Sequence, residues 1–264
     1  MVYSSTVGPI AGRSLFMHYW IAGTLIGLLG SFFGGLFGVG GGVIVIPLMV
    51  WLAKATQHEA HGTSLFAIFF TAFAGAGTYF LHGSASWQAA LGIAASAIFT
   101  ARVGALFAHS LPEKKLKRAF GCFLIIASGM LILKFYLPQQ GFNLSAWTTV
   151  IMYLLVGSVA GFLSGMMGVG GGVVMVPLMV ILGNMEQHLA QGTSLLAMIP
   201  ISFSGAMTHY RLGNVRTSIA WGLVIGALIG GYFGAMLASL LPEIYLRLLF
   251  ASLGIWFGIR SIRA

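Results

Sequence analysis

The stretch Gly38-Val39-Gly40-Gly41-Gly42-Val43, followed by Pro47-Leu48-Met49-Val50, occurs twice in this chain. The second copy begins at Gly168 and keeps its proline at Pro177, an offset of 130 residues. Of the 28 residues from Gly38 to Leu65, 18 are identical to their equivalents 130 positions later. A repeat of this length at a constant offset predicts that the protein consists of two structurally equivalent halves.

The composition restricts the class of protein. The chain has 264 residues, of which 58% are hydrophobic and 6% are charged, and its mean hydropathy is +0.97. A soluble domain carries about 25% charged residues, so we predict an all-α polytopic membrane protein in which 1–264 form a single transmembrane domain. Thirteen Lys and Arg oppose four acidic residues. In a membrane protein these cations are expected in cytoplasmic loops rather than on a nucleic-acid surface.

Apolar segments separated by short polar breaks recur five times in each half. We expect the first repeat (about 10–137) to hold segments at 18–37, 41–53, 62–82, 87–109 and 114–136. The second repeat (about 140–264) holds segments at 145–166, 171–183, 192–211, 217–239 and 243–260, after a linker at 138–145. The second segment of each repeat contains the glycines and is short for a bilayer core of about 30 Å.

An odd number of segments in each half predicts two inverted-topology repeats, and the charges test this. With ten crossings, one side holds ten basic residues: Arg13, Lys54, Lys114, Lys115, Lys117, Arg118, Arg211, Arg216, Arg260 and Arg263. The other side holds only Lys134 and Arg247. If the short segments did not cross, the halves would be parallel and these charges would divide evenly. The positive-inside bias therefore favours ten crossings with both termini cytoplasmic.

The glycine runs are candidate binding elements. Each Gly destabilises a helix interior by roughly 1 kcal/mol relative to Ala, so both runs predict a helix break, followed by a half-helix with free N–H groups at its start. Such paired breaks in inverted repeats point to a transporter site, and an oxyanion suits the positive end of the helix dipole. The candidate ligands are Gly38, Gly40, Gly41 and Gly42, with Gly168, Gly170, Gly171 and Gly172. The alternative is that these glycines only permit close helix packing.

Four hydroxyl residues and one arginine are further candidates for contact with an anion. Thr63 and Ser64, repeated as Thr193 and Ser194, open the next predicted segments, where their hydroxyls would either cap the helices or bind the anion. Arg102 lies inside a predicted membrane segment, where a charge costs roughly 2.5–3.5 kcal/mol. It is expected either to contact the anion or to bond backbone carbonyls and reach an interface.

Seven histidines raise the question of a metal or a proton pathway. They are spread along the chain without a Cys or a carboxylate to complete a metal site, so we expect loop or interface histidines and no metal or cofactor. His58 and His188 are equivalent in the two halves and are expected to be structural or to line a gate, with a proton relay as the alternative. His61 has Gln191 as its equivalent.

The duplicated Gly-Gly-Leu-Phe-Gly-Val-Gly-Gly-Gly-Val-x-x-x-Pro-Leu-Met element, followed by Gly-Thr-Ser-Leu, resembles the TauE/SafE sulfite exporter family. The resemblance covers about residues 18–260 and is specific because the motif occurs in both halves at equal spacing. It implies a small membrane transporter for sulfite or C2–C3 organosulfonates, and it points to the glycine runs with Thr63, Ser64, Thr193 and Ser194. It does not extend to Arg102.

Taken together, these features predict a non-enzymatic transporter in the cell (inner) membrane that exports a small sulfur oxyanion by alternating access. An anion channel of the same architecture, or a carrier of another small anion, is the alternative. No carboxylate lies inside a predicted segment to bind sodium or a proton, since Glu59, Glu113, Glu186 and Glu243 all fall in predicted loops. The expected partners are the anion and the lipid bilayer, with a second copy of the chain left open.

Overall fold

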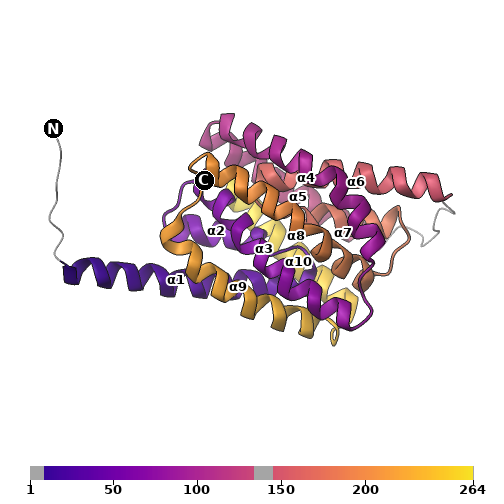
Figure 1. Ribbon diagram of the computed structural model, residues 1–264, viewed down its shortest axis with the longest axis horizontal. Helices are drawn as coiled ribbons and strands as arrows, with labels where there is room; N and C mark the ends of the chain where they lie inside the picture. Colours follow the sequence, from indigo (N-terminus) through magenta and orange to yellow (C-terminus); the bar gives the residue numbers. More distant parts are fainter. Residues whose placement is uncertain (1–8, 134–144, 264) are drawn as a thin grey trace.

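The computed structural model of the protein describes residues 9–133 and 145–263, which form ten α-helices (Figure 1). The first half contains α1 (Pro9–Phe37), α2 (Gly42–Leu52), α3 (Gln57–Leu81), α4 (Trp87–Ser110) and α5 (Glu113–Leu133). The second half contains α6 (Ala146–Met167), α7 (Gly172–Ile181), α8 (Gln187–Arg211), α9 (Thr217–Ala238) and α10 (Glu243–Arg263). Ten helices were predicted at these places. Lys134 and the linker at 138–144 lie outside the described residues.

The five helices of each half do not pack as a separate unit. The long helices form a row in the order α1, α9, α3, α8, α4, α6, so that α1 packs on α9 of the other half and α6 packs on α4. In Figure 1 the α1–α9 and α4–α6 pairs lie on opposite sides of the molecule. The short helices α2 and α7 lie between this row and the α5–α10 pair. The main helix–helix contacts are therefore formed between the two halves and not within each half.

Stripes of glycine explain why the helices at the ends of the row pack so closely. Gly222, Gly226, Gly230 and Gly234 recur every four residues on α9, and each faces the backbone of α1. A Cβ at Gly226 would lie 2.5 Å from the backbone nitrogen of Leu28. Gly157, Gly161 and Gly165 of α6 face α4 in the same way. Small residues at this spacing allow membrane helices to approach backbone to backbone, where packing and not the hydrophobic effect holds them together.

The direction of equivalent helices follows from which residues meet. Gly75 of α3 lies against Leu195 of α8, and Gly205 of α8 lies against Leu65 of α3, so these equivalent helices run antiparallel. The other equivalent pair, α5 and α10, is also antiparallel, because Gly121 meets Gly258 whereas Ser128 meets Gly254. An approximate two-fold axis that relates the halves is therefore perpendicular to these helices.

Two expectations about helix boundaries are wrong. The third segment of each half begins five residues earlier than predicted, at Gln57 and Gln187. Thr56 caps α3 in a capping box, accepting from the amide of Glu59 while the Glu59 side chain accepts from the amide of Thr56. Glu59 and Glu113 lie in the first turns of helices rather than in loops, where a carboxylate is stabilised by the helix dipole.

Candidate anion site at the two helix breaks

Both glycine runs are helix breaks whose backbone requires glycine. Gly38, Gly40 and Gly41 have φ angles of 69°, 84° and 89°, and their equivalents in the second half have 68°, 82° and 81°. Residues with a Cβ rarely adopt this left-handed region, and only Gly does so without strain. The predicted interruptions are therefore present in both halves with the same backbone conformation.

The half-helices after the breaks begin with unpaired amides. Neither Gly41, which precedes α2, nor Gly171, which precedes α7, is accompanied by a side-chain cap. Within 9–133 and 145–263, the amides of Gly41, Gly42 and Val43 have no hydrogen-bond acceptor, and the same is true of Gly171, Gly172 and Val173. All six residues are buried. Buried N–H groups without partners are expensive, particularly where no water reaches them.

The two breaks lie directly against each other at the centre of the molecule. A Cβ on Gly42 would stand 2.5 Å from the carbonyl oxygen of Gly168, and one on Gly172 would stand 2.8 Å from that of Gly38. The side chains of Ile68 and Met198, which are equivalent residues, touch both breaks. The packing role of these glycines, given above as an alternative to ligand binding, is thus present in the structure.

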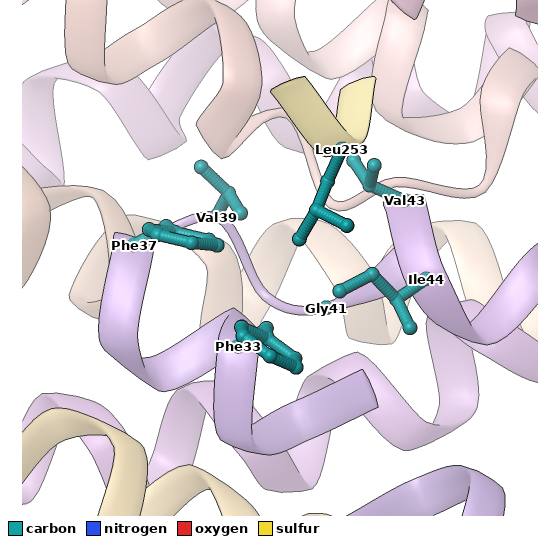
Figure 2. A pocket seen from close by; sticks show the side chains of 8 residues that line it. Phe33, Phe37, Val39, Gly41, Val43, Ile44 and Leu253 are labelled. Carbon is teal, nitrogen blue, oxygen red and sulfur yellow. The ribbon is translucent and has the colours of Figure 1, made fainter. Parts of the chain in front are cut away.

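Little space remains beside the breaks. A pocket next to Gly41 is lined by apolar side chains that include Phe33, Val43 and Leu253, and it has room for about one water molecule. Figure 2 shows Leu253 of α10 lying over the non-helical segment that carries Gly41. The first break is therefore covered by apolar side chains in this conformation, one of them from α10.

The serine hydroxyls fasten each break to the opposite half. Ser64 donates to the carbonyl of Gly168 at 2.5 Å, and Ser194 donates to the carbonyl of Gly38 at 3.0 Å. Both serines are completely buried. The structure thus brings the two predicted serines to the predicted glycines, although each serine is paired with the glycines of the other repeat.

The expectation that Thr63 and Thr193 lie at helix starts is wrong. Both lie well inside helices, because α3 and α8 begin near residues 57 and 187. Thr63 accepts a hydrogen bond from the backbone N–H of Arg216, and Thr193 accepts one from that of Ser86, each at 2.9 Å. These threonines hold the loop that enters the fourth helix of the opposite half, and neither hydroxyl is directed at a break.

Arg102 is not brought to the breaks. It is exposed on the outer side of α4, and no hydrogen bond or ion pair joins it to the described residues. Its neighbour Ala101 is buried against Gly165 of α6, so Arg102 lies on the face of α4 that turns away from the packed helices. An anion contact by Arg102 stays a prediction.

The expectation that the histidines lie in loops or at interfaces is wrong for two of them. His61 and His209 are completely buried within helices α3 and α8. Sequence reasoning missed these residues as a group, although one signal was available. Their equivalents are Gln191 and Tyr79, so each histidine of this pair, one from each half, corresponds to a residue that is not histidine.

These observations define the class of protein. Five of the described helices are long and apolar enough to cross a membrane, and two shorter apolar helices follow the breaks. The fold is therefore that of a multi-pass helical membrane protein with a paired central discontinuity.

Comparison with known proteins identifies the family. The profile described as "Sulfite exporter TauE/SafE" matches residues 23–261, and the chain belongs to this family of membrane transporters. The chain is 28% identical over 233 residues to a "Probable membrane transporter protein YunE" of Bacillus subtilis, covering 80% of this chain and 85% of that protein. A "Probable membrane transporter protein" of Methanocaldococcus jannaschii is 27% identical over 203 residues, covering 74% and 72% respectively. No solved structure matches the chain significantly.

Proposed function

We propose that the protein exports a small sulfur oxyanion, sulfite or a C2–C3 organosulfonate, across the cell membrane by alternating access. In this proposal ten segments cross the bilayer as two inverted repeats of five, with both termini in the cytoplasm. The antiparallel arrangement of α3 with α8, and of α5 with α10, supports the inversion, because equivalent crossing helices would run parallel if the repeats had the same orientation. The uneven distribution of Lys and Arg supports the orientation.

The observation that carries the proposal is the pair of uncapped, buried helix starts at the centre of the molecule. The free amides of Gly41, Gly42 and Val43, and of their equivalents, are donors at the positive end of a helix dipole. Because the two breaks are in contact in this conformation, the anion would enter only after they separate. Ser64 and Ser194, released from the carbonyls of Gly168 and Gly38, would then supply two further donors.

The sulfur chemistry of the proposed anion is suggested by the description of the family. Export needs no coupling ion in principle. An anion that leaves a cell with a negative interior gains about 2.3 kcal/mol per charge per 100 mV. The basic residues that the topology assigns to the cytoplasmic side would raise the local concentration of anions at the entrance.

The test is the flux of labelled sulfite, sulfoacetate and thiosulfate from liposomes that contain the purified protein. Leu253 provides a charge probe, since it is partly exposed and lies over Gly41 (Figure 2). Leu253→Glu places a negative charge beside the amides, whereas Leu253→Gln has nearly the same shape without the charge. A carboxylate that weakens anion binding by about 1.4 kcal/mol lowers binding tenfold.

We therefore expect flux by Leu253→Glu to be at least about tenfold below that by Leu253→Gln when the anion concentration is low. Equal flux by the two variants, both purified as folded protein, would place the anion elsewhere. Absence of flux for all three anions with the unaltered protein would refute the proposed substrate class.

A further inference from the structure

Four histidines gather at one end of the protein, around the end of α6 that leads into the second break. His58 and His61 come from α3, His109 from α4 and His209 from α8, and the rings of His58 and His109 are 6.3 Å apart. The loop residue Asn214 lies between two of them, with its Nδ2 atom 3.2 Å from Nδ1 of His109 and 3.4 Å from Nδ1 of His209.

Two of these histidines hold the last carbonyls of α6. His209 bonds through Nε2 to the carbonyl of Gly165 at 2.9 Å, and His61 bonds through Nδ1 to the carbonyl of Met166 at 3.1 Å. His61 also lies against the next turn, because a Cβ on Gly168 would come within 2.6 Å of the His61 backbone. The two rings are thus attached to the segment that becomes the second break.

The hydrogen bonds determine where the protons are. A carbonyl oxygen only accepts, so Nε2 of His209 and Nδ1 of His61 carry hydrogen. The Asn214 nitrogen only donates, so Nδ1 of His209 and Nδ1 of His109 are bare acceptors. Nε2 of His61 is also bare, and this buried atom has no partner among the described residues. Accordingly the two buried rings, His61 and His209, are neutral in the closed structure.

A proton cannot enter this arrangement without disturbing it. On His209 it would sit on the nitrogen that faces the Asn214 amide, so that the amide would have to turn its oxygen to His209 and would lose its bond to His109. On His61 it would create a buried N–H with no acceptor, together with a buried charge, which is costly. Protonation therefore favours a conformation in which the rings separate from Asn214 and reach water, and this movement pulls on Gly165 and Met166.

At the opposite end of the molecule the positions equivalent to His61 and His209 hold no histidine, although His188 lies there with a buried Nδ1 atom that has no partner among the described residues. The equivalent of His209 is Tyr79, whose hydroxyl bonds to Gly35 at 3.3 Å and to the side chain of Gln191 at 3.2 Å. Gln191 is the equivalent of His61. Tyr has an ordinary pKa near 10 and Gln does not titrate, so the first break is held by groups whose charge does not change at physiological pH.

We propose that the buried His61 and His209, with Asn214, form a proton-binding site that releases the second break when it is occupied. Other titratable and charged groups also lie at this end. They include His58, Glu59 in the first turn of α3, and Glu113, which accepts from the amide of Gln57. Lys117 and Arg260 line a small pocket beside Phe120, and Arg216 donates to the carbonyl of Ala53. His58 donates to the carbonyl of Ala108. No carboxylate bonds to the two rings within the described residues, so a proton here is not neutralised in place.

A metal ion is a poorer occupant than a proton. Among the described residues, no three His, Cys, Asp or Glu side chains converge as metal ligands. The ring nitrogens that face the protein are already used by the carbonyls of Gly165 and Met166. The proton is the ligand for which the bare nitrogens are suited.

The test is amide hydrogen exchange of the second break, with the first break as the internal reference. Exchange of 165–175 and 35–45 is compared at pH 5.5 and pH 7.5, each corrected by the unfolded peptide at the same pH. If the open state has an ordinary histidine pKa of about 6.5 and binds one proton, its population rises about tenfold over this range. The sign follows because the open state binds more protons, so that opening increases as the pH falls.

The chain itself offers the matched control. The double variant His61→Gln with His209→Tyr places beside the second break the residue types that lie beside the first break, and the acid response of 165–175 should disappear. A second variant, Asn214→Asp, replaces the opposing donor by an acceptor of the same shape, which stabilises protonated rings in the closed packing. Because protonation then favours opening less, the increase in exchange of 165–175 between pH 7.5 and pH 5.5 should be smaller in this variant than in the unaltered protein.

We expect the unaltered protein to show faster exchange at pH 5.5 in 165–175 but not in 35–45. An equal response of both breaks, or a response that persists in the double variant, would overturn the proposal. Coupling of this site to transport rests on the proposed function. The exchange experiment needs no substrate, so it would succeed or fail independently of the liposome flux assay.

Discussion

Contact between the two breaks is the feature whose disturbance has the most direct consequence. We consider Gly42→Ala and Gly172→Ala, which add one methyl group on each side of this contact. Neither glycine has a positive φ angle, so the backbone accepts alanine. Any loss of stability therefore arises from steric overlap of the added methyl group. Alanine at a helix start is otherwise favourable, by up to about 1 kcal/mol.

The magnitude follows from the distances. The new Cβ at position 42 would be 2.5 Å from the Gly168 oxygen and 2.7 Å from the Val169 Cα, where ordinary contact begins at 3.4 Å. Both neighbours are backbone atoms, so the breaks must move apart by most of an ångström. Overpacking of this kind typically destabilises by about 1–3 kcal/mol. The hydrogen bond from Ser194 to Gly38, now 3.0 Å, would be stretched by the matching change at position 172.

The control is Gly77→Ala on α3, where no atom lies within 4 Å of the added Cβ. Thermal unfolding of the purified protein is followed by tryptophan fluorescence. We expect Gly77→Ala to be at least as stable as the unaltered protein, and both break variants to be less stable by about 1–3 kcal/mol. The double variant should lose less than the sum, since both methyls open one interface. If Gly42→Ala and Gly172→Ala unfold at the temperature of Gly77→Ala, the breaks are not in contact and the reasoning fails.

Further predictions concern the residues around the breaks and the topology. Thr63→Val should destabilise the protein by about 1–3 kcal/mol because the partly buried amide of Arg216 loses its acceptor, and Thr63→Ser should restore the stability in the same unfolding assay. Arg102→Gln should leave flux within about twofold, as expected for an exposed side chain; a loss of tenfold or more would show that it contacts the anion. In a Cys122→Ser background, cysteines at the equivalent exposed positions Leu81 and Arg211 should be labelled from opposite sides of the membrane, whereas labelling from one side would refute the inverted topology. A planar bilayer held at about 100 mV should show no unitary currents, and resolved currents would favour the channel alternative.

Much of the fold could be predicted because it depends on local composition. Apolar length located the helices, and the glycines located both breaks to within one residue, since α2 begins at Gly42 and α7 at Gly172. The start of α3 was placed late because His58, Glu59 and His61 look polar, although Thr56 and Glu59 form a recognisable capping box. Polar residues are compatible with the first turn of a helix when their side chains bond to other helices. The sequence does not show that His58 and His61 make such bonds.

The candidate site could be predicted only in part. The serines were expected to cap helices or to bind the anion, but not to donate hydrogen bonds to glycine carbonyls of the other half. Arg102 shows that the energetic cost of a charge in a membrane segment does not by itself predict a buried partner. A charge inside an apolar segment suggests a buried partner, yet the exposed face of α4 allows the guanidinium to lie outside the packed helices. Leu253 was not foreseen, because α10 is distant in sequence from the break that it covers.

By itself, the sequence determined that this is a membrane protein of two equivalent halves, each broken at the same glycines. These properties follow from composition and from residues whose backbone preferences act where they stand. Only the tertiary structure decided that α1 packs on α9, that Ser64 and Ser194 cross between the halves, and that four histidines meet beside the second break. Such contacts join residues that are distant in the sequence. They are selected by how closely helices approach each other, which is a property of pairs of surfaces and not of any single segment.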